Sequence, residues 1–365
     1  MNGAARDRLD ALGESILSGG RITPEEGLDL LENETLVHLG AMADLVRRSK
    51  HPDGVVTYVI DRNVNYTNVC NAFCTFCAFY RPPNHQEGYV LPVEEIERKI
   101  RETYDLGGHQ ILLQGGHNPK LRIDYYEDLF RRLKVTFPGL WLHALSPPEI
   151  IHVCRVSRIA IPETIRRLRE AGLDSIPGGG AEILVDAVRE KMIKNKATSQ
   201  EWLGVMEEAH RQGLRSTATM MFGHIETRAH RIEHLEKIRA LQDTTGGFTA
   251  FIGWTYQPGN TELGGVEATT AEYLRTMAVA RIFLDNFANI QASWVTQGPK
   301  VGAASLAFGV NDMGSTMIEE NVVSAAGTTH RMNEPEIVAA VRDAGFIPVR
   351  RNMLYERLGA PASAA

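Results

Sequence analysis

The stretch NYTNVCNAFCTFCAFYRPP, residues 65–83, holds three of the four cysteines in this 365-residue chain. Cys70, Cys74 and Cys77 have the spacing C-x3-C-x2-C in one short loop flanked by Asn and Thr. Coincidental core cysteines would instead be buried singly in apolar surroundings. A zinc site takes four protein ligands, or three and a water. His85 is available to complete such a site, but this spacing fits zinc motifs poorly.

An iron–sulfur cluster is the interpretation that best explains three thiols in one loop. Such clusters are held by cysteine thiolates, ordinarily four. The remaining cysteine, Cys154, lies in the helix-like stretch EIIHVCRVSR and is predicted to be a packed thiol. A four-iron cluster on three thiolates leaves one iron free to bind a substrate or cofactor. The sequence therefore predicts a cluster with one open position.

Composition narrows the class of protein. The chain is 43% hydrophobic and 23% charged, which is enough for one large core. A formal charge of −6 argues against a nucleic-acid partner, which favours a basic excess. The N-terminal sequence MNGAARDRLDALGESI lacks an apolar signal core, and we find no run of about 18 apolar residues for a membrane helix. Four cysteines form no disulfide framework, so we expect a cytoplasmic protein with no membrane partner.

The fold is indicated by β-rich runs that alternate with helix-like segments. Candidate strands occur at 57–61, 110–114, 141–145, 174–178, 216–222, 248–254, 290–295 and 312–317. This alternation predicts an α/β fold with a parallel sheet, and the eight strands favour a (β/α)8 TIM-type barrel over a doubly wound open sheet. We assign residues 1–50 to an N-terminal helical extension with a helix cap at Thr23, residues 51–355 to the barrel domain, and residues 356–365 to a disordered tail.

Polar and Gly-rich segments follow several of the predicted strands. The cysteine loop follows the first strand, QGGH (114–117) the second, SPPE (146–149) the third and GGGAE (178–182) the fourth. Because reactive groups in such barrels lie where strands end, we expect these segments to meet at one rim around a ligand site.

With Phe76 before its last cysteine, the motif resembles the signature of the radical S-adenosylmethionine (SAM) superfamily. The resemblance implies a 4Fe-4S cluster on the three cysteines, with SAM bound to the open iron and cleaved by one electron to a 5′-deoxyadenosyl radical. Arg189 is expected to pair with the SAM carboxylate, since Arg forms forked pairs with carboxylates. The other implied SAM contacts are Gln114, Gly115 and Gly116 through their backbone, Phe76 and Tyr80 beside the adenine, and Ser146 and Glu182.

Longer segments narrow the resemblance. CAFYRPPNHQEGYVL, LHALSPPEI and GSTMIEENVVSAAGTTHRM, among others, resemble the cyclic dehypoxanthinyl futalosine synthases, a radical SAM family of menaquinone biosynthesis. This implies the small-molecule substrate dehypoxanthine futalosine, hydrogen abstraction at its C4′, addition of the carbon radical to the benzoate ring, and oxidation. It also implies a low-potential electron donor such as flavodoxin or ferredoxin. Related aminofutalosine synthases and deazaflavin-precursor synthases stay open as alternatives; a non-enzymatic iron–sulfur electron carrier and a zinc-dependent hydrolase are more distant.

The implied chemistry needs three kinds of protein group. The candidates for holding the benzoate are Arg81, Lys300, His330 and Arg331. The candidates for the base that takes the ring proton are Glu149, Glu320 and Tyr89, beside Glu319, His117 and His143. The candidates for contacts to the sugar are Asn65, with Asn68, Gln257 and Asn260 at neighbouring strand ends. The sequence does not choose among the members of each set.

Overall fold

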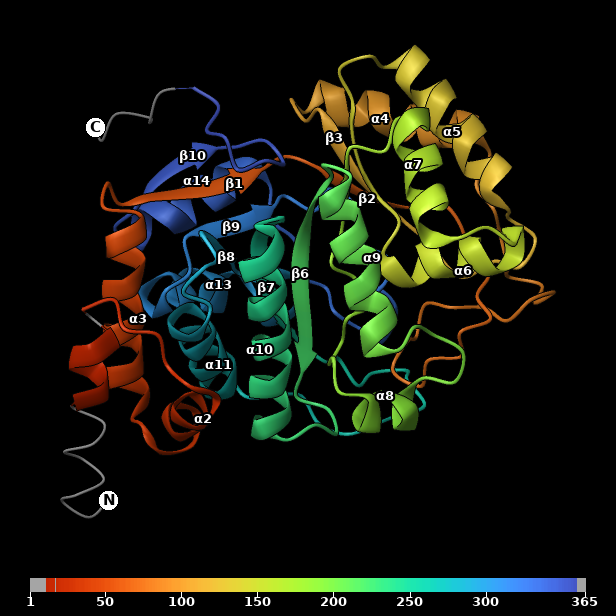
Figure 1. Cartoon of the computed structure of the whole chain (residues 1–365). Helices are drawn as coiled ribbons and strands as arrows, with labels where there is room; N and C mark the ends of the chain where they lie inside the picture. Colours follow the sequence, from red (N-terminus) through yellow and green to blue (C-terminus); the bar gives the residue numbers. More distant parts are fainter. Residues whose placement is uncertain (1–10, 17, 360–365) are drawn as a thin grey trace.

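The protein is built on one parallel β-sheet that curls into a half-barrel (Figure 1). The computed structural model describes residues 11–16 and 18–359. Within these residues, ten strands run in the order β10-β1-β9-β8-β7-β6-β5-β4-β3-β2. The strands are β1 (Val55–Val59), β2 (Arg62–Asn65), β3 (Gln110–Gln114), β4 (Trp141–Ala144), β5 (Ser175–Ile176), β6 (Arg215–Phe222), β7 (Phe248–Thr255), β8 (Asn289–Gln291), β9 (Asp312–Ser315) and β10 (Ile347–Arg350). The predicted α/β class and parallel sheet are confirmed.

The sheet differs from the predicted eight strands at its two ends. The first predicted strand, 57–61, overlaps β1 only, and β2 was not predicted. The chain changes partners at Ile60 and Asp61: β1 pairs with β9 and β10, whereas β2 pairs with β3. The tenth strand was not predicted. Its sequence IPVR is short and contains Pro348, and proline in a sheet is confined to positions such as an edge strand. The observed β10 is indeed an edge strand, beside β1.

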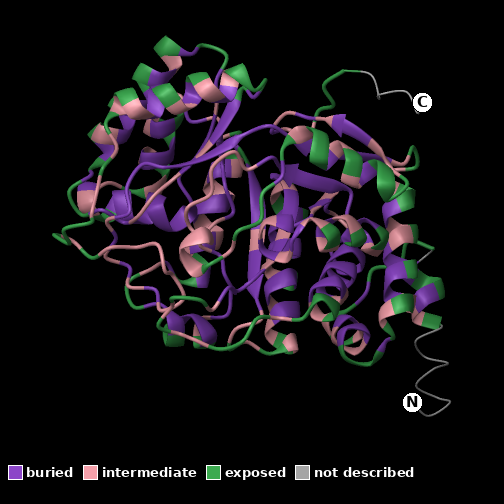
Figure 2. Ribbon diagram, turned by 180° about the vertical axis from the view of Figure 1, so that it is seen from behind, coloured by how far each residue is buried: buried purple, intermediate pink, exposed green. Residues whose placement is uncertain are grey.

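Helices cover the outer face of the sheet (Figure 1). Figure 2 shows the strands largely buried and the exposed residues mainly on outward helix faces and loops. All residues of β1 and β2 are buried, as expected for parallel strands covered on both sides. The described helices are α2 (Pro24–Asn33), α3 (Leu36–Lys50), α4 (Val93–Asp105), α5 (Ile123–Thr136), α6 (Pro147–Ser157), α7 (Ile161–Ala171), α8 (Asp186–Met192), α9 (Ser199–Arg211), α10 (Arg228–Thr245), α11 (Thr270–Phe283), α12 (Trp294–Gln297), α13 (Pro299–Ser305) and α14 (Glu334–Asp343), with short 3-10 turns η1 (Leu306–Phe308) and η2 (Ser324–Ala326).

The N-terminal helices pack on the outside of the half-barrel. The predicted cap at Thr23 is confirmed: its hydroxyl accepts from the Glu26 amide, and the Glu26 carboxylate accepts from the Thr23 amide. Helices α2 and α3 contact α10 and α11. Residues 1–10 and 17 of the predicted extension lie outside the described residues.

The C-terminal end of the described chain returns to β1. Of the predicted tail, residues 360–365 lie outside the described residues. Arg357 forms an ion pair with Asp53, and the Leu358 amide donates to the Arg350 carbonyl. Among the helices that the structure describes, we find none long and apolar enough to cross a membrane.

Candidate active site

The cysteine loop folds back on itself directly after β2. The Cys70 amide donates to the Arg81 carbonyl at 2.9 Å, and the Arg81 amide donates to the Asn68 carbonyl at 2.8 Å. The Arg81 guanidinium donates to the carbonyls of residues 78–80 and to the Glu87 carboxylate. Arg81, predicted to bind the benzoate, therefore braces the loop that carries the cysteines.

The three thiols suit ligation by a cation. All are free, Cys70 and Cys74 are buried, and burial raises the pKa of each thiol, Cys77 included. Such thiols stay protonated at neutral pH unless positive charge stabilises their thiolates, which iron supplies. Within the described residues, no three His, Cys, Asp or Glu side chains are grouped as ligands of a single metal ion. Ligands of a four-iron cluster need not meet at one ion, because each binds a different iron.

Two glycines let the loop after β3 lie against the cysteine loop. A Cβ on Gly116 would lie 2.3 Å from the Val69 carbonyl oxygen and 2.9 Å from the Cys70 Cβ. A Cβ on Gly115 would lie 2.7 Å from the Tyr66 ring. Only glycine permits this approach. The structure thus brings the predicted Gln114–Gly116 segment and the cysteines together.

A buried ion pair lies beside the thiols. Lys196 Nζ donates to Glu182 Oε1 at 2.8 Å and lies 5.5 Å from the centre of the Phe76 ring. Burial lowers the pKa of Lys196, but attraction to Glu182 and Cys74 outweighs it, so the net shift is upward. Glu182 has φ 41° and is 4% exposed, and its Oε2 is buried without a hydrogen-bond partner. A bound cofactor that donates a hydrogen bond there would satisfy this oxygen, which fits the predicted SAM contact.

No pattern in the sequence indicates a role for Lys196. Lys191, Lys194 and Lys196 lie within a six-residue segment at and after the end of α8, the pattern of a solvated charged segment. Only the tertiary fold turns Lys196 toward Glu182 and Cys74.

Arg189, predicted to bind the SAM carboxylate, lies beside Glu182, with its Nη1 3.7 Å from Glu182 Oε2. Its guanidinium is 3% exposed and donates to the backbone carbonyls of Gly180, Ala181, Ile183 and Ala197. These bonds fix the segment between the Gly-rich loop and α9. The cation placed beside the cysteines is Lys196.

Glu149, a predicted base, links three segments of the chain through hydrogen bonds. It accepts from the Ser146 amide at 2.8 Å and hydroxyl at 2.6 Å, from the Gly115 amide at 2.9 Å and from the Tyr66 hydroxyl at 2.9 Å. Burial raises the pKa of Glu149, while these donors lower it. A carboxylate has about four acceptor positions, so Glu149 is fully engaged in positioning the loops, and the Ser146 hydroxyl uses its one donor on Glu149.

The inside of the half-barrel contains a cavity of about 280 Å³, here called the lumen cavity. Part of its wall is apolar and includes Ile252, Trp254, Trp294 and Met313. Its polar lining includes Asp61, Asn63, Gln114, His143, Thr217, Thr219, Gln291, Ser315, Glu320 and Arg351. Burial lowers the pKa of His143 to about 3, so this side chain is neutral at physiological pH. The cavity combines an apolar surface for a ring with many groups for hydroxyls.

A smaller cavity of about 40 Å³ joins the cysteine loop to the lumen cavity. It is lined by Phe76 and Cys77 on the cysteine side. Trp254, Val322 and Val323 line both cavities. A reactive species formed at the cysteine loop would therefore face the lumen cavity across these shared side chains.

Residues 319–328, here called the strap, cross the mouth of the half-barrel after β9. Glu320, Val322 and Val323 line the lumen cavity, whereas Glu319 and Asn321 line a separate cavity of about 470 Å³. The Glu320 carboxylate accepts from the amides of residues 322–324, which shapes the strap. Asn260 and Gln257, predicted sugar contacts, bond to the strap through the Ala325 carbonyl and the Thr328 hydroxyl.

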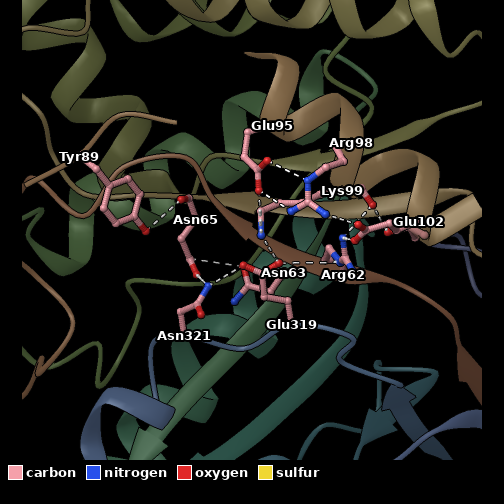
Figure 3. Close-up of polar contacts among 11 residues, drawn as sticks. Arg62, Asn63, Asn65, Tyr89, Glu95, Arg98, Lys99, Glu102, Glu319 and Asn321 are labelled. Atoms are coloured by element: carbon pink, nitrogen blue, oxygen red, sulfur yellow. Dashed lines mark hydrogen bonds and ion pairs between the residues drawn. The ribbon is translucent and has the colours of Figure 1, made fainter. Parts of the chain in front are cut away.

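Polar contacts hold the strap to β2 and α4 (Figure 3). Lys99 lies between Glu95 and Glu319 and donates to Glu319 at 2.5 Å. Asn321 Nδ2 donates to Asn65 Oδ1 at 3.2 Å.

Tyr89, predicted as a base, is part of the same polar cluster. Its hydroxyl donates to the Asn65 carbonyl at 3.2 Å, and burial raises its pKa to about 12. Tyr89 lines the separate cavity, on the other side of the strap from Glu320.

Other predicted residues lie on outer surfaces. Lys300 lines a groove between α13 and α14, and His330 and Arg331 are exposed, with His330 beside Gly298. The Tyr80 hydroxyl donates to Glu262 at 3.4 Å. None of these four is among the described residues that line the lumen cavity.

Comparison with known families matches this arrangement. The Radical SAM superfamily matches residues 64–238, and the CofH/MqnC C-terminal region matches residues 245–364. The chain belongs to the radical SAM superfamily, in the branch that carries this C-terminal region.

Two relatives that match nearly the whole chain share one name. The chain is 48% identical to cyclic dehypoxanthine futalosine synthase of Halalkalibacterium halodurans, over 95% of this chain and 94% of that protein. It is 50% identical to the enzyme of the same name from Streptomyces coelicolor, over 93% and 86%. Aminodeoxyfutalosine synthase of Thermus thermophilus is 40% identical, over 98% of both chains. The crystal structure of methylornithine synthase (PylB) shares the fold, with a TM-score of 0.70 at 20% identity over 93% of this chain and 97% of that one.

Proposed function

We propose that this chain is a radical SAM enzyme that cyclises dehypoxanthine futalosine to cyclic dehypoxanthine futalosine. The observation that carries the proposal is the lumen cavity, which the small cavity beside Phe76 and Cys77 links to the cysteine loop, in a chain 48–50% identical to the cyclic dehypoxanthine futalosine synthases. Its volume of about 280 Å³ is near the lower end of small-ligand pockets, which suits one compact substrate that carries a sugar and a benzoate.

The residues of this chain divide the work of holding the cofactors. Cys70, Cys74 and Cys77 would ligate a 4Fe-4S cluster. Glu182 would accept a hydrogen bond from SAM, with Lys196 holding the carboxylate in place, and Gly115 and Gly116 allow backbone approach. When bound, the cluster and SAM supply a 5′-deoxyadenosyl radical that removes hydrogen from the substrate.

The cavity walls would protect and orient the substrate. The strap covers the lumen cavity, and Trp254, Trp294 and Met313 exclude water from the ring. Of the predicted base candidates, Glu320 and His143 line this cavity. We further infer a low-potential electron donor such as flavodoxin or ferredoxin and a cytoplasmic setting, since low-potential reduction and free thiols both suit a reducing compartment.

The test is an anaerobic assay with reconstituted protein, a reductant, SAM and dehypoxanthine futalosine, analysed by mass spectrometry. We expect 5′-deoxyadenosine and a product two hydrogens lighter than the substrate. A variant with Cys70, Cys74 and Cys77 replaced by Ala is the matched control and should form neither. Deoxyadenosine without the lighter product would refute the cyclase assignment and point to a related substrate. The absence of deoxyadenosine from a protein with an intact cluster would refute the radical reaction.

A further inference from the structure

Three polar residues form a row along the inside of the half-barrel. Asn63 and Asn65 alternate along β2, so they share one face, because successive strand side chains point to opposite faces. Asp61 lies two residues before Asn63, just outside the strand. Asp61 and Asn63 line the lumen cavity. Asn65 lies at the rim, where it bonds to Asn321 of the strap (Figure 3). The row therefore runs from inside the cavity to its cover.

Asp61 is the charged member of this row and retains acceptor capacity. It is 6% exposed, and its Oδ1 accepts from the Ser315 hydroxyl. Its Oδ2 accepts from Gln110 Nε2 at 3.3 Å. A carboxylate has about four acceptor positions, so about two remain for a ligand in the cavity.

Among the described residues, no Lys, Arg or His side chain forms an ion pair with Asp61. Arg351 is the nearest cation, but it forms a forked pair with Asp312 through bonds of 2.6 and 2.9 Å. Because Asp312 neutralises Arg351, Asp61 is left with neutral donors only. Burial raises the pKa of Asp61, because few donors stabilise the charged carboxylate away from water. The other titratable groups that line the cavity are His143, Glu320 and Tyr355.

We propose that Asp61 binds the sugar of the substrate by accepting hydrogen bonds from two adjacent hydroxyl groups, with Asn63 as the neighbouring polar contact. This inference rests on the proposed function and assigns the sugar end of the substrate to the β1–β2 side of the cavity. A pair of hydroxyls supplies two donors for the two open acceptor positions. Trp254 and Trp294 in the same cavity offer the apolar surface that the aromatic end needs.

The test compares two ligands on two proteins. Asp61→Asn keeps the side-chain shape but replaces one acceptor oxygen by a donor. Affinity is measured by calorimetry, and by the fluorescence of Trp254 and Trp294, on reconstituted protein with SAM and without reductant, so that no turnover occurs. The ligands are dehypoxanthine futalosine and an analogue in which two adjacent sugar hydroxyls are replaced by hydrogen.

We expect Asp61→Asn to weaken binding of the natural ligand by about 10- to 100-fold, because hydrogen bonds to a charged group are the strong ones. Binding of the analogue should stay within about twofold of the wild-type value. Asp186→Asn removes a carboxylate of equal size whose partners are Ser199 at the start of α9 and Arg189 at 3.9 Å, neither of which lines the cavity, and it should change neither affinity.

Three outcomes would overturn the inference. An equal loss for both ligands would show that Asp61 only maintains the cavity. Unchanged affinity for the natural ligand would show that Asp61 does not bind it. Wild-type protein that binds neither ligand, yet forms deoxyadenosine from SAM once reductant is added, would overturn the proposed function and this inference together. If Asp61→Asn does not fold, Gln110→Met is the second variant, because it removes one hydrogen-bond donor to Asp61 and Gln110 does not itself line the cavity. We expect it to cause a smaller loss of affinity, confined to the natural ligand.

Discussion

Gly116→Ala is predicted to displace the cysteine loop, because the added methyl group has no space. The new Cβ would lie 2.3 Å from the Val69 carbonyl oxygen, whereas ordinary contact begins at 3.4 Å. The backbone of the cysteine loop must therefore move by about 1 Å, as overpacking requires. Since the clash is with backbone and with the Cys70 Cβ at 2.9 Å, no side-chain rotation relieves it.

The expected cost is at the upper end of the overpacking range, about 3 kcal/mol of unfolding free energy. Gly204→Ala is the matched control, since Gly204 lies inside α9 and a Cβ there meets no atom within 4 Å. Replacing a glycine inside a helix by alanine stabilises it by up to about 1 kcal/mol. The same substitution should thus have opposite effects at the two positions.

The assay measures urea unfolding of both variants, followed by iron and sulfide per chain after anaerobic reconstitution. We expect Gly116→Ala to lose most of its cluster uptake and Gly204→Ala to match the wild type. Cluster uptake and stability of Gly116→Ala equal to those of the wild type would refute the close contact between the two loops.

Two further predictions concern buried charge. Lys196→Met should lower the unfolding free energy by about 3 kcal/mol, the lower end of the range for a broken buried ion pair, because the Glu182 carboxylate keeps only Arg189 at 3.7 Å as a cation. Adding Glu182→Gln should recover part of that loss, and a double variant no more stable than the single one would contradict the pairing. Burial lowers the pKa of His143 from 6.5 to about 3, so the unfolded chain binds this proton at a higher pH than the folded protein does. The contribution of His143 to the free energy of unfolding is therefore highest above pH 6.5 and decreases as the pH falls toward 3. From pH 7 to 5, His143→Asn should therefore lose about 2 kcal/mol less unfolding free energy than the wild type, measured by urea titration, and equal losses would contradict it.

Much of the candidate site was predictable because its residues are close in the chain or follow strands. The three cysteines share one loop, and the Gln114–Gly116 segment follows β3, so the periodicity of the sequence places both at the same rim. The roles of single charged residues were harder to predict. Glu149 has the expected chemistry, but it also accepts hydrogen bonds from Gly115 and Tyr66, which only the folded chain brings near, and Arg189 donates its hydrogen bonds to backbone carbonyls.

By itself, the sequence determined the cluster motif, the α/β class and the family resemblance, because each depends on local spacing and residue type. Tertiary structure alone decided that Lys196 pairs with Glu182, that Asp61 lies in the lumen cavity without a cation, and that the strap separates Tyr89 from Glu320. The physical reason is that burial and partner choice are set by contacts between segments far apart in the chain. Such contacts determine that Glu182 pairs with a cation, that Glu320 accepts from backbone amides, and that Asp61 retains acceptor positions.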